Sequence, residues 1–331
     1  MNHRTLGDVG AVSEVGYGSW QIGSDWGDVS EAEAVAAVEA AREAGIDFFD
    51  TADVYGDGRS EQILGDVLDA DIAAGDVTVA TKAGRRLDPH VPEAYSETNL
   101  RQFVDRSREN LGMETLDLVQ LHCPPTDVYY RPETFDALET LADEDRIANY
   151  GVSVERVEEG LKALEYPGVQ SVQIIFNPFR QRPADRFLDA AAESDVGVIC
   201  RVPLASGLLT GALSRDTAFP EDDHRNYNRD GDAFDVGETF AGVPYEVGLE
   251  AADALAERAP ATDEGLSLPE LSLRWILDHD AVTTVIPGST TPEHIRSNAA
   301  VSDLAPLDEA DREAVDDVYD ASVREHVHQR W

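Results

Sequence analysis

Residues 46–56, which read Ile46-Asp47-Phe48-Phe49-Asp50-Thr51-Ala52-Asp53-Val54-Tyr55-Gly56, decide the fold. The stretch opens with a short apolar run that lacks strict alternation, which is typical of a strand buried on both faces. The run ends at an aspartate, and glycines at positions 56 and 58 mark the loop that follows. The stretch therefore predicts an interior strand of a parallel sheet, with polar side chains just beyond its end.

Similar apolar runs alternate with amphipathic helical patterns along the whole chain. This alternation indicates parallel βαβ units, and a count of eight strands favours a closed (β/α)8 TIM barrel over an open doubly wound sheet. Strands are predicted over residues 14–18, 46–50, 77–81, 116–122, 148–153, 171–176, 196–201 and 283–287. Helices are predicted over residues 30–44, 60–68, 96–111, 132–143, 184–193 and 245–258, the first opened by a capping box of Ser30 and Glu33.

A dinucleotide-binding Rossmann sheet is the alternative architecture, because Gly16-Tyr17-Gly18 lies in the first predicted strand. Gln21 occupies the third glycine position of that motif, and no helical pattern opens before about Ser30. The barrel is therefore the preferred interpretation.

Two segments outside the alternation complete the predicted architecture. Residues 2–12, with a turn at Gly7-Asp8, predict a β-hairpin that plugs one barrel end. Residues 202–244, after the seventh strand, are too long and polar for a simple turn and predict a lid loop at the barrel mouth. No repeat or linker divides the chain, so residues 1–331 are expected to form a single domain.

The charge balance is extreme. Asp and Glu total 66 against 26 Lys and Arg, which gives a formal net charge of −40. Such a balance argues against binding to nucleic acid or to an anionic membrane. Residues 1–10 lack the apolar region of a signal peptide, and no apolar run has the length of a membrane span. We expect a cytoplasmic protein of a salt-adapted organism, because concentrated salt screens the repulsion between like charges.

Cysteine use is sparse. Cys123 and Cys200 are too few for a disulfide framework in a chain of this length, and their spacing is not that of a metal site. Both are expected to be buried thiols, and no metal site is predicted.

Four polar residues are candidates for chemistry, because active sites of TIM barrels lie at the carboxyl ends of the strands. Asp50, Lys82 and His122 follow three consecutive strands, and Tyr55 lies five residues beyond Asp50. Lysine is nearly absent from the chain, which makes its presence at a strand end informative. Lys82 beside Tyr55 is expected to lower the tyrosine pKa, Asp50 to hold Lys82, and His122 to place a substrate oxygen. A carbonyl reduced here would need hydride from a cofactor, since side chains supply none.

Each of these residues also has a plain structural interpretation. Asp50 could cap a helix, Tyr55 could pack in its loop, and His122 could be a hydrogen-bonded core histidine. Their convergence on one barrel face favours the functional interpretation of the set.

These motifs resemble the aldo-keto reductase family. The resemblance rests on Phe49–Gly56 as quoted above, Ala80-Thr81-Lys82, Leu118-Val119-Gln120-Leu121-His122 and Ile286-Pro287-Gly288-Ser289, in the family's order and spacing. It implies a catalytic set of Asp50, Tyr55, Lys82 and His122, with Trp20, Tyr55 and His122 in contact with substrate.

The resemblance also implies a nicotinamide cofactor. The nicotinamide end would contact Gly18, Ser19, Trp20, Asp50, Ser153, Gln173 and Arg201, the last standing where many members place a stacking aromatic residue. The pyrophosphate would follow Pro203, Leu204, Ser206, Gly207 and Leu209. The adenosine end would meet Gly288, Ser289, Thr290, His294, Arg296, Ser297 and Asn298, around the start of a helix that suits an anion. Arg296 or His294 favours NADP(H), while Gly288 in place of a lysine leaves NAD(H) open.

The substrate is expected to be an aldehyde, a ketone or an aldose sugar, converted to or from an alcohol or lactone. Aromatic residues that could line the pocket are Trp20, Trp26, Tyr129 and Trp331. One alternative is a nucleotide-binding regulatory barrel that resembles potassium-channel β subunits. Another is a barrel lyase or hydrolase, for which the sequence offers neither a metal cluster nor a second placed acid. The oligomeric state is left open.

We expect the protein to unfold when it is moved from molar KCl into buffer below about 1 M salt. Repulsion between carboxylates then reaches further, because the Debye length grows from about 3 Å at 1 M to about 10 Å at 0.1 M. Circular dichroism across a KCl series checks this expectation. Unchanged stability in dilute buffer would contradict the salt-adapted interpretation.

Overall fold

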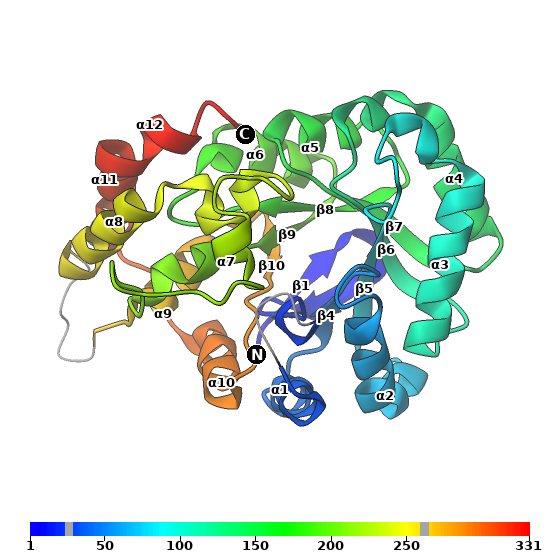
Figure 1. The fold of residues 1–331 in the computed structure, drawn as a ribbon, viewed down its shortest axis with the longest axis horizontal. Coiled ribbons are helices and arrows are strands. Elements are labelled where there is room, and N and C mark those ends of the chain that lie inside the picture. The colour runs from blue at the N-terminus through cyan, green and yellow to red at the C-terminus, as the bar shows by residue number, and fades with distance from the viewer. Residues whose placement is uncertain (24–28, 259–264) are drawn as a thin grey trace.

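The computed structural model describes residues 1–23, 29–258 and 265–331, and its described strands form a barrel (Figure 1). Eight parallel strands lie in one sheet in the order β3 to β10, each beside its neighbours in sequence. Their bounds are β3 (Tyr17–Gly18), β4 (Phe48–Asp50), β5 (Thr78–Ala83), β6 (Leu116–His122), β7 (Ile147–Ser153), β8 (Val169–Ile175), β9 (Gly197–Arg201) and β10 (Val282–Val285). The predicted alternation of strands and helices is confirmed.

The sheet closes where its first and last strands meet. Val15 forms a parallel bridge with Val285, and the amide of Gly16 donates to the Val285 carbonyl at 2.8 Å. The amide of Val285 in turn donates to the Glu14 carbonyl at 3.0 Å. The regular part of the first strand is shorter than the predicted 14–18, yet these bonds complete the predicted barrel.

Helices form the outer layer of the barrel (Figure 1). Those described are α1 (Glu31–Glu43), α2 (Arg59–Ala74), α3 (Glu97–Leu111), α4 (Pro132–Asp143), α5 (Val157–Ala163), α6 (Phe187–Glu193), α7 (His224–Tyr227), α8 (Tyr245–Arg258), α9 (Leu268–Leu277), α10 (Pro292–Ala300), α11 (Glu309–Val318) and α12 (Arg324–Val327). The capping box of Ser30 and Glu33 is present at the start of α1, as predicted.

Two predicted helix boundaries are wrong. Helix α2 continues past residue 68 to Ala74 and ends at the left-handed Gly75, because exposed acidic residues interrupt its apolar pattern without breaking the helix. Helix α6 begins at Phe187 rather than at 184, since Arg182–Asp185 forms a separate 3-10 turn. Helices α5, α7, α9, α11 and α12 were not predicted.

The predicted N-terminal hairpin is present and plugs the amino end of the barrel. Strand β1 (His3–Leu6) pairs antiparallel with β2 (Gly10–Ser13), in the register His3 to Ser13. Leu6 and Val12 belong to a buried cluster whose other members are Phe48, Ala80, Leu118, Ile199 and Ile286. Leu6 packs so closely on Gly197 that a β-carbon there would lie 2.3 Å from the leucine Cδ1. This end of the barrel is therefore filled.

The long connection after β9 folds as a series of short turns at the opposite end. Besides α7 it contains the 3-10 turns Ala205–Thr210, Val236–Glu238 and Phe240–Gly242. The Phe234 ring lies 6.1 Å from Trp20, and Glu238 accepts a hydrogen bond from Arg85. Both partners follow barrel strands, so the connection covers the barrel mouth as predicted.

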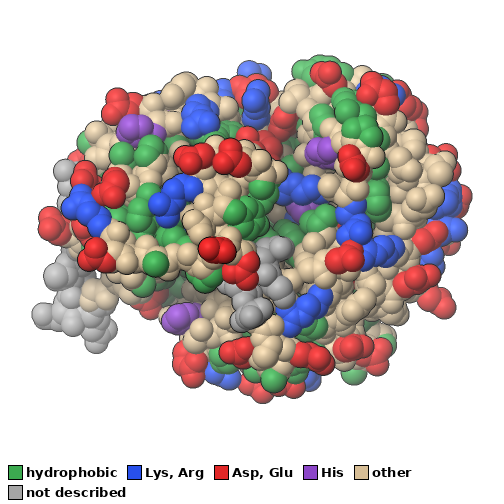
Figure 2. Space-filling model, viewed as in Figure 1, with side chains coloured by type: hydrophobic (Ala, Val, Ile, Leu, Met, Phe, Trp, Pro, Cys, Tyr) green, Lys and Arg blue, Asp and Glu red, His purple; other side chains and the backbone are tan. Residues whose placement is uncertain are grey.

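Acidic side chains spread over the face of the molecule shown in Figure 2. Cys123 and Cys200 are buried and unbridged, as the sequence predicts. Among the helices of the described ranges, none is both long and apolar enough to traverse a bilayer.

Candidate active site

The predicted catalytic set meets at the carboxyl end of the barrel. Lys82 in β5 donates from Nζ to Asp50 Oδ2 at 2.6 Å and to the Thr51 carbonyl at 2.8 Å. The same ammonium lies 3.4 Å from the Tyr55 hydroxyl. The imidazole of His122, at the end of β6, faces the Tyr55 ring edge-on with centroids 5.9 Å apart. Side chains from three strands thus form one cluster.

Asp50 is held on both of its oxygens. Gln173 Nε2 in β8 donates to Asp50 Oδ1 at 2.7 Å, opposite the oxygen that accepts from Lys82. Gln120 Nε2 approaches the same Oδ1 at 3.4 Å, and the Ser153 hydroxyl lies 3.5 Å from Gln173 Oε1. Gln120 was not predicted as a site residue, although it stands inside the motif that ends in His122. The carboxylate therefore has a fixed orientation toward Lys82.

The Tyr55 pKa contradicts the direction expected from the sequence. Burial raises the pKa of the phenol well above 10, and the carboxylates of Asp50 and Glu238 act in the same direction. Arg85 and Arg201 oppose this shift. The predicted lowering of the Tyr55 pKa is wrong for this structure, because burial of the phenol, followed by the Asp50 and Glu238 carboxylates, raises it. Tyr55 is accordingly a protonated donor at neutral pH.

His122 is neutral in this environment. Burial lowers the pKa of the imidazole well below 6.5, and Arg85 and Lys82 lower it further. Its Nδ1 is buried and has no hydrogen-bond partner among the described residues. Burial also lowers the Lys82 pKa, an effect that the neighbouring Asp50 opposes. The cluster can donate a proton from Tyr55 while a neutral imidazole orients the accepting oxygen.

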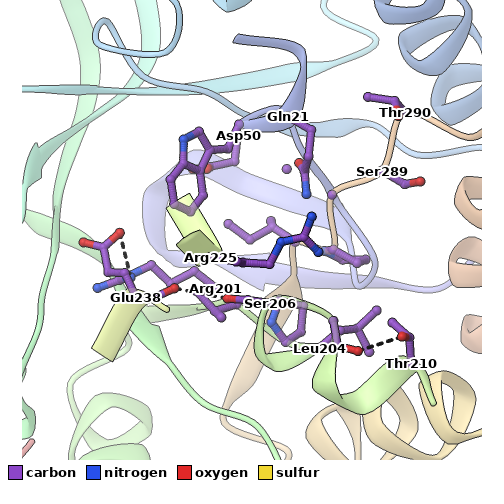
Figure 3. Close-up of a pocket in the computed structure, with 18 of the residues that line it drawn as sticks. Gln21, Asp50, Arg201, Leu204, Ser206, Thr210, Arg225, Glu238, Ser289 and Thr290 are labelled. Atoms are coloured by element: carbon purple, nitrogen blue, oxygen red, sulfur yellow. Dashed lines mark hydrogen bonds and ion pairs between the residues drawn. The ribbon is translucent and has the colours of Figure 1, made fainter. Parts of the chain in front are cut away.

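A cavity of about 420 Å³ begins at Tyr55 and Asp50 and extends to the loop after β10 (Figure 3). Most of the predicted cofactor residues line it: Gly18, Trp20, Asp50, Gln173, Arg201, Pro203, Leu204, Ser206, Gly207, Gly288, Ser289 and Thr290. They come from the ends of five strands and from the connection after β9. The sequence motifs and the cavity therefore coincide.

The other predicted cofactor residues do not reach the cavity surface. Ser19, Ser153, Leu209 and Asn298 are buried behind it, and His294, Arg296 and Ser297 are exposed on α10. Ser19 instead supports the site, because its hydroxyl donates to the Asp50 carbonyl at 2.8 Å. Arg296 lies at the surface with one amino group 3.4 Å from Glu43.

The cavity has features that fit a large polar ligand. A β-carbon on Gly18 would lie 2.7 Å from the Ile286 carbonyl, so only glycine allows the strands their close approach here. Gln21 Oε1 is buried without a hydrogen-bond partner in the described part of the chain. Ser289 and Thr290 line the cavity just before the amino end of α10, where unpaired amides favour an anion.

Several residues of the site were missed in the sequence. Gln21, Arg225 and Glu238 line the cavity, and Arg85 contacts its edge through Glu238. Arg225 and Glu238 belong to the long connection, whose irregular pattern gave no signal for individual side chains. Of the aromatic residues expected to line the pocket, Tyr129 and Trp331 are buried away from it, and Trp26 lies outside the described residues.

Fold and site together define a TIM-barrel protein in which a large cavity lies beside a buried cluster of Lys82, Asp50 and Tyr55. A family model described as the aldo/keto reductase family matches residues 14–320. The chain belongs to this family. The predicted class, an NAD(P)-dependent oxidoreductase, is confirmed by that membership.

Individual relatives span nearly the whole chain. The oxidoreductase YqkF of Bacillus subtilis (strain 168) is 30% identical over 319 residues, which cover 95% of each chain. A probable voltage-gated potassium channel subunit beta of Oryza sativa subsp. japonica is 29% identical over 319 residues, 93% of each chain. The holo form of aldo-keto reductase AKR11C1 from Bacillus halodurans has a TM-score of 0.77 at 26% identity, with 99% of each chain covered.

Asp53 is a buried acid within the same loop as Tyr55. Its side chain is fully buried, and neither carboxyl oxygen has a hydrogen-bond partner among the described residues. Burial raises its pKa to about 7, helped by the nearby Glu61 and opposed by Arg86, Arg106 and Lys82. The folded protein thus binds a proton that the unfolded chain releases at lower pH.

We expect Asp53→Asn to flatten the pH dependence of stability between about pH 4 and pH 7. The unfolded chain loses its Asp53 proton near pH 4, so wild-type stability falls by about 1.4 kcal/mol per pH unit until the folded state also ionises. Denaturant unfolding at a series of pH values measures this slope. The exposed Asp69→Asn is the control, and equal slopes in wild type and Asp53→Asn would refute the assignment.

Proposed function

We propose that the protein is an NADP(H)-preferring oxidoreductase that interconverts an aldehyde, ketone or aldose sugar with its alcohol or lactone. Tyr55 is the general acid and base. The observation that carries this proposal is the position of Lys82 Nζ, 2.6 Å from Asp50 and 3.4 Å from the Tyr55 hydroxyl, beside a cavity large enough for a nucleotide.

The residues act on a carbonyl oxygen held between Tyr55 and His122. A reduced nicotinamide, when bound, would supply the hydride that the carbonyl carbon needs. Negative charge then gathers on the oxygen, which Tyr55 protonates. The resulting phenolate faces the Lys82 ammonium, and a hydrogen bond to a charged acceptor is stronger than one to a neutral acceptor. In the oxidative direction the phenolate takes the alcohol proton, and Asp50 keeps Lys82 in place throughout.

Some of the remaining predicted residues would contact the cofactor directly, and the others would support those contacts from behind. Gln173 and Arg201 would meet the nicotinamide end, with Ser153 close behind Gln173. Residues Pro203, Leu204, Ser206 and Gly207 would follow the pyrophosphate, with Leu209 buried in the same turn. Ser19 would support the nicotinamide end through its hydrogen bond to the Asp50 carbonyl. At the far end, Arg296 and His294 lie on the exposed face of α10, where they can approach a 2′-phosphate. In a chain of net charge −40, such a cationic position favours NADP(H).

A regulatory role like that of a potassium-channel β subunit is the second candidate, because the rice relative named above covers most of the chain. The assembled Tyr55, Lys82, Asp50 and His122 cluster favours the enzyme. We further propose cytoplasmic location in a salt-adapted cell, supported by the acidic surface (Figure 2).

Tyr55→Phe is expected to lower turnover about 100-fold or more while cofactor affinity stays within a few-fold of wild type. The variant removes the proton donor but keeps the ring, and placed acids contribute about 10²–10⁴ to rate. Absorbance of reduced nicotinamide in molar KCl, with a panel of carbonyls, sugars and alcohols, measures turnover. Tyr130→Phe, at an exposed tyrosine, is the control. Full activity in Tyr55→Phe would exclude Tyr55 as the proton donor.

Arg296→Ala is expected to weaken NADPH binding about tenfold and NADH binding much less. The loss of one charge-assisted bond to a 2′-phosphate accounts for that difference. Fluorescence titration with each cofactor measures it, with the exposed Arg312→Ala as control. Equal effects on both cofactors would remove the phosphate role from Arg296.

A further inference from the structure

A cluster of buried and partly buried charges borders the cavity on the side of the long connection. Its members are Arg85, Glu155, Arg201 and Glu238, here called the ion cluster. Arg85 Nη2 donates to Glu238 Oε1 at 2.6 Å and lies 3.4 Å from Glu155 Oε1. Arg201 Nη2 lies 3.2 Å from Glu155 Oε2, and its Nη1 lies 3.6 Å from Glu238 Oε2. Each carboxylate therefore faces both guanidinium groups.

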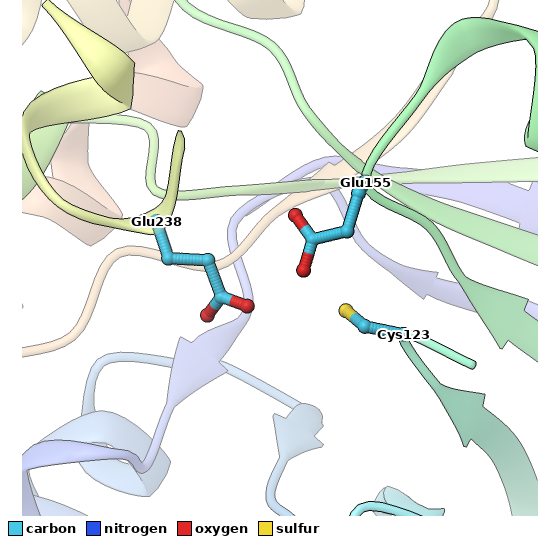
Figure 4. Close-up of side chains that lie close together, drawn as sticks. All are labelled: Cys123, Glu155 and Glu238. Atoms are coloured by element: carbon cyan, nitrogen blue, oxygen red, sulfur yellow. The ribbon is translucent and has the colours of Figure 1, made fainter. Parts of the chain in front are cut away.

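The cluster is an ion network rather than a cage for a metal. Cys123, Glu155 and Glu238 place ligand-type atoms within 4.8 Å of one another (Figure 4). However, the two guanidinium groups already engage the carboxylate oxygens, and Arg201 Nη2 also lies 3.6 Å from the Cys123 sulfur. A cation would have to displace both guanidinium groups. The two carboxyl groups of the cluster differ in pKa. Burial raises the pKa of Glu155 to about 8, while Arg85 and Arg201 hold the pKa of Glu238 well below its usual value.

Glu238 differs from the other members in its origin. Arg85, Glu155 and Arg201 follow strands of the barrel, whereas Glu238 is carried by the connection after β9. Glu238 and Arg201 line the same cavity as Tyr55 (Figure 3). Glu238 therefore joins the connection to the barrel through its ion pairs with Arg85 and Arg201, beside the proposed proton donor Tyr55.

Trp331 fixes the turn that carries Glu238. Its indole nitrogen donates to Asp235 Oδ1 at 2.9 Å, and the Arg180 guanidinium carbon lies 3.8 Å from the centre of its ring. A β-carbon on Gly237 would lie 3.0 Å from the indole, and one on Gly242 would lie 2.5 Å away. The backbone on both sides of Glu238 is therefore pressed against one aromatic ring.

We propose that Glu238 is a positioning residue that Trp331 holds in place, and that it sets the arrangement of Arg201 at the cavity surface and of Arg85 at its edge. Both guanidinium groups then already have a carboxylate partner when substrate arrives. Removal of the Glu238 carboxylate takes that partner from the buried Arg201 and the partly buried Arg85, and releases the connection. This inference rests on the proposed oxidoreductase activity.

Steady-state kinetics of Glu238→Gln against pH tests the proposal. We expect KM for the carbonyl substrate to rise about tenfold, because the arginines lose their partner and the cavity changes shape. The alkaline limb of the kcat profile should move to lower pH by at least half a unit, since the Glu238 carboxylate raises the Tyr55 pKa. A purely structural role would lower the amount of folded protein without moving that limb. The control is Glu246→Gln. Glu246 lies on α8, and its exposed carboxylate pairs with Arg215.

Trp331 supplies the second arm of the experiment. Trp331→Ala should shift KM and the pH profile in the same direction as Glu238→Gln, and Trp331→Phe, which keeps the ring stack on Arg180, should restore most of the difference. The double variant of Glu238→Gln and Trp331→Ala should be little worse than Glu238→Gln alone, because both changes act through one carboxylate.

Wild-type KM and pH profile in Glu238→Gln would overturn the inference, as would fully additive effects of the two changes. Should Glu238→Gln fail to fold, the Trp331→Ala and Trp331→Phe pair decides the question by the same two readouts. Absence of turnover in the wild-type protein with every carbonyl and both nicotinamides would instead refute the proposed function.

Discussion

The buried pair of Lys82 and Asp50 is the interaction on which the rest of the site depends. A lysine ammonium with 1% of its side chain exposed needs compensation for the water it has lost, and a carboxylate at 2.6 Å provides it. Gln173 and Gln120 hold the second oxygen of that carboxylate, so the pair draws together side chains from four strands, β4, β5, β6 and β8. The sheet must therefore be closed and in register before the amine can face the Tyr55 hydroxyl.

The two ends of the barrel differ in what fills them. At the amino end, Leu6 and Val12 fill the interior with apolar packing against Phe48 and its neighbours. At the carboxyl end, the strands finish in polar groups that are only partly hydrogen-bonded to one another and that leave a cavity. Burial then shifts their pKa values, which is why Tyr55 stays protonated and His122 stays neutral.

The parts of the fold and site that the sequence revealed are those with a local signature. Asp50, Lys82 and His122 each follow an apolar run, so their strands and their shared edge could be predicted. The end of α2 could not, because the apolar pattern fades before the helix does. Glu238 and Arg85 were missed because their role arises from a contact between segments far apart in the chain. The direction of the Tyr55 pKa was missed for a related reason, since burial outweighs a single neighbouring charge and cannot be judged from spacing.

Closure of the barrel has a consequence for how the chain folds. The Tyr17 hydroxyl donates to the carbonyl of Ser289, 272 residues further along, and the same seam carries the bonds that join β3 to β10. Bringing such distant segments together costs about 5 kcal/mol in chain entropy if nothing between them is yet ordered. This entropy cost falls as each intervening βαβ unit pairs with the one before it, because less disordered chain then separates the two ends. We therefore expect the seam that joins the first and last strands, and with it the cavity wall between Gly18 and Gly288, to form late in folding.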